Sequence, residues 1–441
     1  MMDYQQAEAY LFSQLPMYQR IGSKAWKPGL DNIRLLLDEL GNPQEGLRMI
    51  HIAGTNGKGS VCHILSALLQ QHGWRIGLYS SPHYQSYRER IKINSELIEE
   101  AVIADYVQRL KPLIEKHQFS FFEISVAMSL LYFKEQKVDL AIIETGMGGR
   151  LDSTNIISPI VCGITNIGMD HTDVLGDTLE QIAGEKAGII KEFVPVVIGE
   201  KQKELSAVFK NYAKKQNAPL VYADQLAEAQ VLDDGFVQVS LQGEEAVVDY
   251  GLKGAYQLNN LVTALAIYRV VCLELDEHLQ SATSLKKALL EVRQLTGFMG
   301  RFQMMPGSPA VLLDSAHNPE GFESLSEDLK QMDYGRLHIV LGMSAGKDVQ
   351  SCLSYLPRSA QLYVSAANVP RAMQANVLNE ILMGMEFQSH TFQDLKTALK
   401  EALSSASDKD LILITGSVFT VAELLDQFPQ DVLRTSTNLA V

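Results

Sequence analysis

A glycine-rich stretch between two apolar segments constrains the fold of this sequence more than any other feature. The segment GTNGKGS covers residues 54–60, follows the apolar run 49–53 and opens an apolar-periodic segment that ends at His72. A glycine-rich turn between a strand and a helix directs backbone N–H groups at one point, where the helix dipole adds partial positive charge. Lys58 adds a full positive charge. The sequence therefore predicts a polyphosphate-binding loop at the start of a helix.

The loop differs from the common P-loop pattern, G-x-x-x-x-G-K-[ST]. That pattern requires glycine at position 52 and serine or threonine at position 59, whereas this chain has Ile52 and Gly59, with the hydroxyl at Ser60. We assign Lys58 to the β- and γ-phosphates of a nucleoside triphosphate, and Ser60 to the phosphates or a metal. The alternative is a turn without a ligand, and the placement of the whole segment between strand and helix favours the nucleotide.

The residues around the loop predict a first α/β domain. A strand, the loop, a helix at 60–72 and a second strand form a βαβ unit, which implies a parallel sheet. The expected strands are 47–53, 75–80, 138–143, 160–165 and 194–198, with a helical segment at 3–40, a hairpin at 236–241 and 246–250 around Gly243-Glu244-Glu245, and helices at 259–273 and 285–293.

The segment LTGFMG at 295–300 interrupts this pattern, and a new alternation of strands and helices follows it. The expected strands there are 310–313, 337–341, 361–365 and 410–414. We therefore predict a P-loop NTPase-like domain with a mostly parallel sheet over residues 1–296 and a smaller Rossmann-like α/β domain over residues 297–441.

Composition narrows the class of protein. The net charge of −14 argues against general nucleic-acid binding, which usually needs a basic face. The four cysteines are far apart and form no CxxC pair, as expected of thiols in a reducing compartment. The N-terminus lacks the apolar region of a signal peptide, and no run approaches the ~18 apolar residues of a membrane helix. We expect a cytoplasmic enzyme without membrane or nucleic-acid partners.

A carboxylate follows the predicted strand at 138–143. Glu144 stands at the strand end and precedes Gly146 and the pair Gly148-Gly149. In a doubly wound sheet the carboxyl ends of the strands face the ligand crevice, and a carboxylate there commonly holds Mg²⁺. A surface glutamate is the alternative, and the neighbouring loop favours the metal.

Three further segments contain residues that spacing alone does not single out. His171 follows the strand at 160–165, and Lys186 lies in a predicted helix, where it is more often a solvated charge. Ser81 follows the strand at 75–80 and could offer an oxygen to a metal, and Arg90 could hold a substrate carboxylate. Taken alone, a Ser/Pro turn and a charged surface helix start explain the last two residues better.

The second domain has comparable positions at its own strand ends. Arg301 follows Gly300 at the domain junction, where an arginine can reach a phosphate as an arginine finger does. Asp314 begins the segment DSAHNP after a strand, and Ser417 lies in a strand-to-helix turn that could bind a carboxylate through backbone amides. Helix caps are the alternative for these segments.

Eight motifs occur in one order along nearly the whole chain. They are HIAGTNGKGS (51–60), LYSSPH with RERIKIN (78–94), FFE (121–123), ETGMGGRLDSTN (144–155), DHTDVLG with IAGEKAGIIK (170–191), GRFQ (300–303), DSAHNP (314–319) and TGSVF (415–419). Together they closely resemble the bacterial folylpolyglutamate synthase / dihydrofolate synthase family, within the Mur ligase superfamily.

The resemblance implies roles for individual residues. Thr55, Asn56, Gly57, Lys58, Gly59 and Ser60 form the ATP-binding loop, Asn260 and Arg301 match nucleotide contacts from the second domain, and Asp314 matches a nucleotide or hinge contact. Ser81, Glu144 and His171 match Mg²⁺ ligands, and Lys186 matches a lysine that is carbamylated in the superfamily and so offers an oxygen ligand. Arg90, His317 and Ser417 match positions around the incoming glutamate, and Phe122 and Asp152 match the pterin-substrate side. Lys58, Lys186 and His317 are the implied catalytic residues.

The resemblance implies ATP-dependent amide ligation, with Mg²⁺ as cofactor. The expected partners are ATP, L-glutamate and dihydropteroate or folates, and we expect a monomer. The chain departs from the family at 298–301, where FMGR replaces W-P-G-R or L-P-G-R, and at 346–348, where GKD replaces D-K-D. Neither departure removes a metal ligand.

Three alternatives to the bifunctional enzyme are a monofunctional folylpolyglutamate synthase, a peptidoglycan Mur ligase and a nucleotide-binding switch without catalysis. The Mur ligase carries a domain of ~100 residues before the loop, a full domain by size, whereas 53 residues precede Gly54 here. The combined metal-side and acceptor-side motifs argue against the switch.

Overall fold

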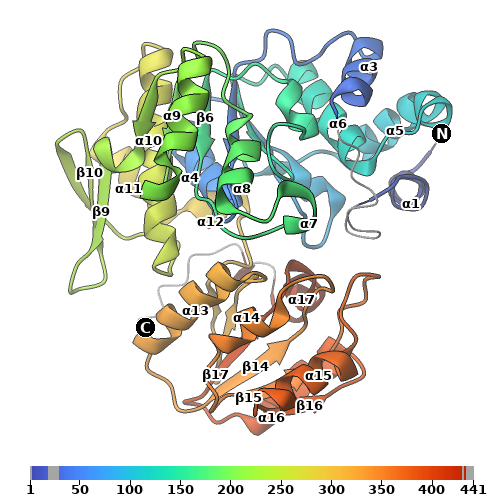
Figure 1. Cartoon of the computed structure of the whole chain (residues 1–441), viewed down its shortest axis with the longest axis vertical. Helices are drawn as coiled ribbons and strands as arrows, with labels where there is room; N and C mark the ends of the chain where they lie inside the picture. Colours follow the sequence, from blue (N-terminus) through green and yellow to red (C-terminus); the bar gives the residue numbers. More distant parts are fainter. Residues whose placement is uncertain (1, 18–28, 430–431, 434–441) are drawn as a thin grey trace. The chain divides into compact units, whose positions relative to one another are not determined.

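The computed structural model describes residues 2–17, 29–429 and 432–433. The chain divides into two compact units. The first contains Met1–Tyr250 and Gln257–Thr296, and the second contains Gly251–Tyr256 and Gly297–Val441. In Figure 1 the first unit runs from blue to yellow and the second is mostly orange and red.

An eight-stranded sheet forms the centre of the first unit, in the order β4-β3-β2-β5-β1-β6-β7-β8. Six of its strands pair in parallel, and β3 and β4 add an antiparallel edge. The bounds are β1 (Met49–Ala53), β2 (Ile76–Tyr79), β3 (Ile91–Ile93), β4 (Glu96–Leu97), β5 (Leu140–Glu144), β6 (Val161–Ile164), β7 (Val196–Ile198) and β8 (Leu220–Tyr222). The predicted parallel sheet is confirmed.

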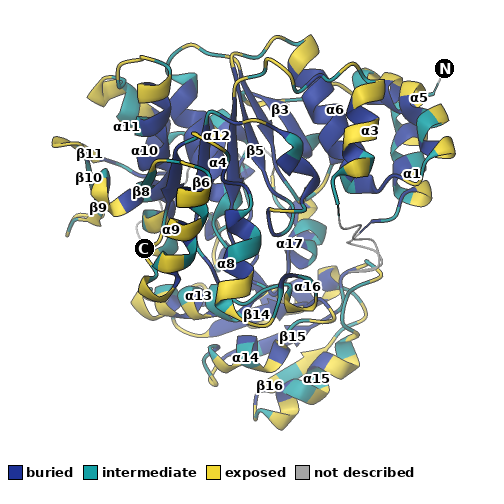
Figure 2. Cartoon of the chain, turned by 45° about the horizontal axis from the view of Figure 1, so that its top comes forward, coloured by how far each residue is buried: buried dark blue, intermediate teal, exposed yellow. Residues whose placement is uncertain are grey.

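Helices flank this sheet, and Figure 2 shows the buried strands between them. The central strands β1 and β5 are buried at every position, because a parallel sheet is covered on both faces. The α-helices of this unit are α1 (Tyr4–Gln14), α3 (Asp31–Glu39), α4 (Lys58–Gln70), α5 (Glu100–Lys116), α6 (Phe121–Glu135), α7 (Thr172–Leu175), α8 (Leu179–Ala187), α9 (Ser206–Lys215), α10 (Tyr256–Glu274), α11 (Ala282–Leu290) and α12 (Val292–Thr296). The part of the expected N-terminal helical segment at 18–28 lies outside the described residues.

The expected hairpin belongs to a three-stranded antiparallel sheet of β9 (Ala227–Val231), β10 (Val237–Leu241) and β11 (Glu244–Val248). The turn is Gln242-Gly243, because both residues have positive φ angles, of 52° and 85°. Such two-residue turns match the twist of antiparallel strands. The expectation that Glu244 and Glu245 lie in the turn is therefore wrong.

The second unit contains a six-stranded sheet in the order β12-β13-β17-β14-β15-β16. All its strands pair in parallel except β12, which is antiparallel to β13. The strands are β12 (Gln303–Met305), β13 (Ala310–Leu313), β14 (Leu337–Leu341), β15 (Gln361–Val364), β16 (Gln388–Thr391) and β17 (Leu411–Thr415). The helices are α13 (Pro319–Gln331), α14 (Val349–Ser354), α15 (Ala375–Gly384), α16 (Leu395–Ser405) and α17 (Val418–Leu424). This is the predicted smaller α/β fold.

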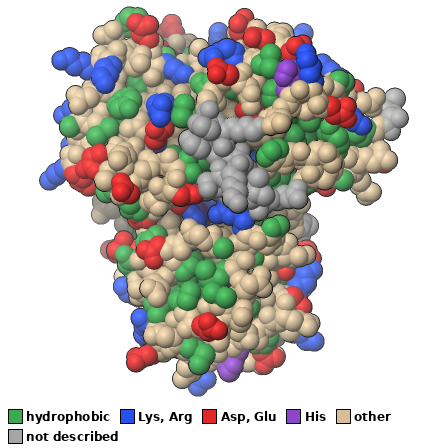
Figure 3. Space-filling model, turned by 45° about the vertical axis from the view of Figure 1, so that its right-hand side comes forward, with side chains coloured by type: hydrophobic (Ala, Val, Ile, Leu, Met, Phe, Trp, Pro, Cys, Tyr) green, Lys and Arg blue, Asp and Glu red, His purple; other side chains and the backbone are tan. Residues whose placement is uncertain are grey.

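No helix among the described residues is long and apolar enough to cross a membrane. On the face shown in Figure 3, acidic and basic side chains are interspersed. The four cysteines are buried and free.

Candidate active site

The glycine-rich loop joins the central strand β1 to α4. Gly57 precedes the helix with a φ of 81°, in the left-handed region, and no side chain in the described part of the chain caps the helix N-terminus. Gly54 has a φ of 151°. The first turn of α4 therefore presents uncapped backbone N–H groups and a positive dipole end, an arrangement suited to phosphate. Ser60 is buried in this turn.

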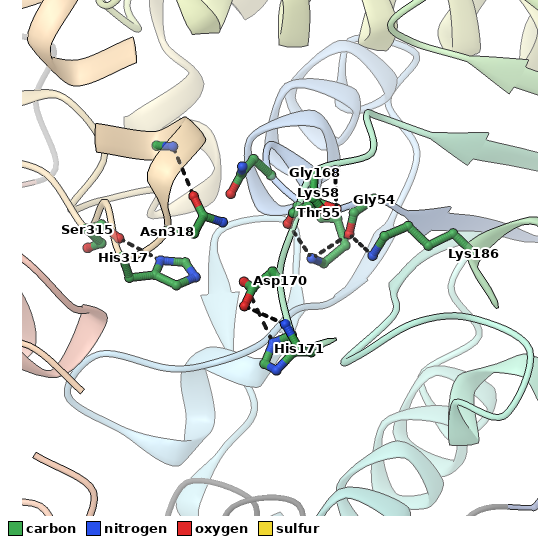
Figure 4. A network of polar contacts seen from close by, with 12 residues as sticks. Gly54, Thr55, Lys58, Gly168, Asp170, His171, Lys186, Ser315, His317 and Asn318 are labelled. Atoms are coloured by element: carbon green, nitrogen blue, oxygen red, sulfur yellow. Dashed lines mark hydrogen bonds and ion pairs between the residues drawn. The ribbon is translucent and has the colours of Figure 1, made fainter. Parts of the chain in front are cut away.

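Two lysines from distant parts of the chain contact one carbonyl of the loop. The Lys58 ammonium donates to the Gly54 oxygen at 3.0 Å and to the Thr55 oxygen at 3.1 Å. Lys186, near the end of α8, donates to the same Gly54 oxygen at 2.8 Å. Figure 4 shows both amines directed at this carbonyl. The structure thus brings two predicted catalytic residues together.

Lys186 lies in a setting that disfavours its positive charge. Its side chain is buried, with 3% exposed. Burial and, to a smaller extent, the charge of Lys58 lower the pKa of Lys186 to about 7, against the opposing effect of Asp170 and Asp152. A substantial fraction of Lys186 is therefore a neutral, nucleophilic amine near neutral pH.

The predicted metal ligands Ser81 and Glu144 also lie together. The Ser81 backbone N–H donates to the buried Glu144 carboxylate at 3.1 Å. A Cβ placed on Gly59 would lie 3.9 Å from both Glu144 oxygens, so this carboxylate borders the loop. The end of β5 thus brings a hard oxygen ligand to the phosphate-binding turn, as Mg²⁺ requires.

His171 directly precedes α7 and has a φ of 53°. Its Nε2 atom lies 3.9 Å from an Asp170 oxygen, and 27% of its side chain is exposed. Among the described residues, no group of three or more histidine, cysteine, aspartate or glutamate side chains has the arrangement of a metal site. The predicted ligand set contains only two residues of these types, Glu144 and His171.

Asn260 lies on α10 and packs directly on the loop. A Cβ placed on Gly57 would lie 2.1 Å from the Asn260 Oδ1 atom, so only glycine fits at this turn. Gln257 accepts a hydrogen bond from the Asn260 Nδ2 atom at 3.0 Å and orients the amide. The expectation that Asn260 belongs to the second domain is wrong, because Gln257–Thr296 are part of the first unit.

The segment after β6 supports the loop in a way that the sequence did not reveal. The Thr55 and Asn56 N–H groups donate to the backbone and side-chain oxygens of Asn166, each at 2.9 Å. The Thr55 hydroxyl donates to the Gly168 oxygen at 3.2 Å. In the sequence, only His171 of this segment was a candidate site residue. Its position after a parallel strand was the available signal, because strand ends of one sheet lie together.

The two residues predicted on the pterin-substrate side meet at Gly146. Asp152 is buried and accepts hydrogen bonds from the Gly146 and Met147 N–H groups, each at 2.9 Å. The Phe122 ring lies so close that a Cβ on Gly146 would be 2.5 Å from its Cζ atom. Burial raises the pKa of Asp152, and its hydrogen bonds oppose this.

Arg90 is buried at the end of a 3-10 turn, Tyr87–Arg90. Its Nε atom donates to His83 Nδ1 at 2.8 Å, and its guanidinium lies 5.2 Å from the centre of the Phe121 ring. Phe121 neighbours Phe122, so Arg90 is placed near the predicted substrate side.

In the second unit, Arg301 and Asp314 each form a hydrogen bond with the backbone of the residue next to the other. Arg301 donates to the Ser315 oxygen at 3.1 Å, and the Phe302 N–H donates to the Asp314 carboxylate at 2.9 Å. Tyr256 donates to the same Asp314 oxygen at 3.0 Å. Burial raises the pKa of Asp314, and the Arg301 charge opposes the shift.

His317 and Ser417 follow strands of the second sheet. His317 Nδ1 lies 3.0 Å from the Ser315 oxygen. Ser417 caps α17 by accepting the Thr420 N–H at 3.0 Å. The capping role that the sequence left open for this segment is therefore present.

A cavity of about 660 Å³ in the first unit lies beside the three-stranded sheet. Its lining comes mainly from Gly199, Glu200 and Lys201, which follow β7, and from β9, β10, β11 and α10. The loop residues 54–60 are not part of this lining.

Two Mur ligase families match the chain. The Mur ligase middle domain matches residues 52–268, and the Mur ligase glutamate ligase domain matches residues 300–418. The fold and the phosphate-binding loop therefore define a Mur ligase.

Individual relatives narrow the assignment. The chain is 34% identical to the dihydrofolate synthase/folylpolyglutamate synthase of Bacillus subtilis, over 90% of this chain and 94% of the relative. It is 31% identical to the Escherichia coli protein of the same name, over 96% of each. The chain thus belongs to the dihydrofolate synthase/folylpolyglutamate synthase family. It spans half the length of a 32% identical Haloferax volcanii relative, a probable bifunctional folylpolyglutamate synthase/dihydropteroate synthase.

Solved structures agree with this assignment. Escherichia coli FolC in complex with DHPP and ADP matches with a TM-score of 0.84 and 28% identity, over 96% of this chain and 97% of that one. A bifunctional folylpolyglutamate synthase/dihydrofolate synthase with Mn, AMPPNP and L-glutamate bound matches with a TM-score of 0.82 and 29% identity. The match covers 96% of this chain and 98% of that one.

Proposed function

We propose that this chain is an ATP-dependent ligase that joins L-glutamate to dihydropteroate and to the terminal glutamate of a folate. The observation that carries the proposal is the convergence of Lys58, Lys186 and Glu144 on an uncapped helix N-terminus. Cations and a hard-oxygen ligand around one phosphate site suit phosphoryl transfer. The solved relatives that bind ADP, DHPP, AMPPNP and L-glutamate support the choice of substrates.

In the proposed reaction a substrate carboxylate attacks the γ-phosphate of ATP, which yields an acyl phosphate and ADP. The amino group of L-glutamate then attacks the acyl carbon, so that an amide forms and inorganic phosphate and a proton leave. Lys58 and the N–H groups of α4 offset negative charge on the transferred phosphoryl group. Asn260 and Gln257 hold the turn at Gly57 in the required conformation.

The residues near the loop fit a magnesium site. Ser81, Glu144, His171 and a carbamylated Lys186 would hold the ion, which when bound offsets charge on the phosphates. An ammonium does not fit beside a cation, whereas the lowered pKa of Lys186 leaves a neutral amine that can react with CO₂. Carbamylation converts this amine to a carbamate, whose oxygens are hard ligands.

The remaining assignments follow from the resemblance to the family. Arg301 and Asp314 contact the nucleotide, Arg90, His317 and Ser417 surround the incoming glutamate, and Phe122 and Asp152 contact the pterin-bearing substrate. The burial of Arg90 and Asp152 supports these roles, because buried charges need specific partners.

We also propose that residues 1–296 act as the ATP-binding domain and 297–441 as the glutamate ligase domain of a cytoplasmic monomer. The buried, free cysteines support a reducing compartment. Small molecules are its proposed partners, and the net charge of −14 speaks against nucleic acid.

The test is purified protein with ATP, Mg²⁺, L-glutamate and either dihydropteroate or tetrahydrofolate. We expect ADP and a new amide in equal amounts with each pterin. Product with tetrahydrofolate alone would indicate a monofunctional folylpolyglutamate synthase. ADP release that depends on neither pterin would contradict the proposal.

A further inference from the structure

A buried series of hydrogen bonds connects the central strand β1 to the carboxylate of Asp152, a residue predicted on the pterin-substrate side. His51 lies on β1, and its Nε2 atom is 2.8 Å from the Thr154 hydroxyl oxygen. The Thr154 hydroxyl and N–H both donate to Asp152 Oδ1. His51 and Thr154 have no exposed surface, and 6% of Asp152 is exposed. None of the sequence motifs gave His51 or Thr154 a role.

The single O–H group of Thr154 determines which group donates and which accepts in each of these hydrogen bonds. Thr154 has a single O–H group, which it donates to the Asp152 carboxylate, so its oxygen can only accept from His51. The Nε2 atom of His51 is therefore protonated, while its buried Nδ1 atom has no hydrogen-bond partner among the described residues. Burial lowers the pKa of His51 to about 3, and the charge of Lys191 contributes, so the ring stays neutral.

The other oxygen of Asp152 holds the turn that follows β5. Oδ2 accepts the N–H groups of Gly146 and Met147, each at 2.9 Å. The register of the sheet pairs His51 with Ile143, the residue before Glu144. The chain of bonds therefore runs from a strand that leads into the phosphate loop to a turn that begins two residues after Glu144.

We propose that His51 and Thr154 are positioning residues that hold the Asp152 carboxylate in place for the pterin-bearing substrate. The two strands that carry the phosphate loop and Glu144 are thereby tied to the acceptor side of the site. The inference rests on the proposed function, because that function places Asp152 beside the pterin. A bond to a buried carboxylate is among the stronger hydrogen bonds in proteins, so its loss should be measurable.

The test compares Thr154→Val, which removes the hydroxyl at nearly constant volume, with Thr154→Ser, which keeps it. We expect Thr154→Val to raise the KM for dihydropteroate about tenfold, with the KM for ATP changed less than about twofold. Thr154→Ser should stay within about twofold of the wild type in both. Ser129→Ala is the control, since it removes another buried hydroxyl, whose bond stays within α6.

His51 variants test the other end of the chain. His51→Leu removes the donor and should raise the KM for dihydropteroate, whereas His51→Gln retains an N–H and should lie closer to the wild type. The double variant His51→Leu/Thr154→Val should be no worse than Thr154→Val alone, because both changes break one chain of bonds. Should Thr154→Val fail to fold, His51→Leu provides the same measurement.

An unchanged KM for dihydropteroate in Thr154→Val and His51→Leu would overturn the proposal that these two residues position Asp152. An equal rise in the KM values for ATP and dihydropteroate would do the same, since it would mark a general structural defect. If the wild type itself does not use dihydropteroate, that result contradicts the proposed function and not the positioning role of His51 and Thr154.

Discussion

At the scale of single residues, Lys186 is the least expected feature of the site. It lies 132 positions beyond Gly54 and donates to the same carbonyl as Lys58. Two amines at one oxygen are stable because burial favours the neutral form of Lys186. Helical spacing alone suggested that Lys186 is a solvated charge, whereas a buried amine that is partly neutral is a reactive group.

Replacing Lys186 tests its proposed role as a carbamate that would hold the metal ion. Lys186→Ala should lower turnover at least ~100-fold, because an oxygen ligand is lost. A short-chain carboxylic acid should restore part of the activity by supplying the missing oxygens, measured as ADP release.

Lys191→Ala is the matched control for this experiment. Lys191 also donates to a backbone carbonyl, that of Asn155, at 2.8 Å. Its variant should not respond to the carboxylic acid. Full activity of unrescued Lys186→Ala would contradict the proposed role of Lys186 as a metal ligand.

Gly57 permits a second prediction at this scale. Gly57→Ala places a Cβ 2.1 Å from the Asn260 side chain, at a φ of 81°. We expect the Kd for AMPPNP, measured by calorimetry, to rise at least about tenfold, because the loop must move away from its phosphate-binding shape.

Gly73→Ala is the control that separates the strain of a positive φ from the close contact with Asn260. Gly73 has a φ of 76°, and no atom of the described residues lies within 4 Å of the position that a Cβ would take there. This variant should lose about 1–2 kcal/mol of stability from the backbone alone and bind AMPPNP as the wild type does. Equal Kd values for Gly57→Ala and the wild type would show that the close contact does not matter.

At the scale of elements, the turn after β5 fits tightly against α8. A Cβ on Gly149 would lie 2.8 Å from the Glu185 oxygen and 2.9 Å from the Lys186 oxygen. The Arg150 N–H donates to the same Glu185 oxygen at 2.7 Å. The glycine therefore sets the distance between the turn that follows Glu144 and the helix that carries Lys186.

Gly149→Ala should move α8 and misplace Lys186. Because the contacts are with backbone, which cannot rotate away, we expect a loss of about 1–3 kcal/mol in stability and a fall in kcat. Thermal unfolding and steady-state assays measure the two effects.

Gly184→Ala is the control on the same helix, since its Cβ would meet only the Tyr212 hydroxyl, at 3.5 Å, among the described residues. That change should raise stability by up to ~1 kcal/mol through helix propensity. A Gly149→Ala protein as active as Gly184→Ala would contradict the spacing argument.

How far the sequence predicted these elements depended on burial. Strand β13 has the predicted bounds, 310–313, and β14 has the predicted bounds 337–341, because each is an apolar run in a covered sheet. Strand β16 reads QSHT and is mostly exposed at the sheet edge, so it has no apolar pattern and was missed. The helix expected at 285–293 is broken at Glu291 into α11 and α12, where no proline or glycine marks the break.

Local sequence patterns also predicted only part of the candidate site. Lys58 and Glu144 could be predicted because the loop before Lys58 follows β1 and Glu144 ends β5, and both strands belong to one parallel sheet. The contacts of Asn260 with Gly57, and of Thr154 with His51, join segments more than 100 positions apart. Such contacts depend on how helices and turns pack on the sheet, which local patterns do not encode.

At the scale of the whole molecule, the chain passes between its two units three times, at 250/251, 256/257 and 296/297. The phosphate loop, Glu144 and Lys186 belong to the first unit, whereas Arg301, His317 and Ser417 belong to the second. The residues to which the proposed function gives roles are thus distributed over both units. One phosphate site would serve two acceptors, since formation of the acyl phosphate is common to dihydropteroate and to folates.

A shared phosphate site makes a prediction about the ratio of the two activities. Asn260→Ala removes the side chain that packs on Gly57 and should lower turnover with dihydropteroate and with tetrahydrofolate by the same factor, because both depend on the same bound ATP. Thr154→Val should change the two activities unequally if they differ in how they use Asp152, so it serves as the contrast. The measurement is ADP release with each acceptor at saturating L-glutamate. A drop confined to one acceptor in Asn260→Ala would mean that ATP is held differently for the two reactions, and a single phosphate site would no longer account for both.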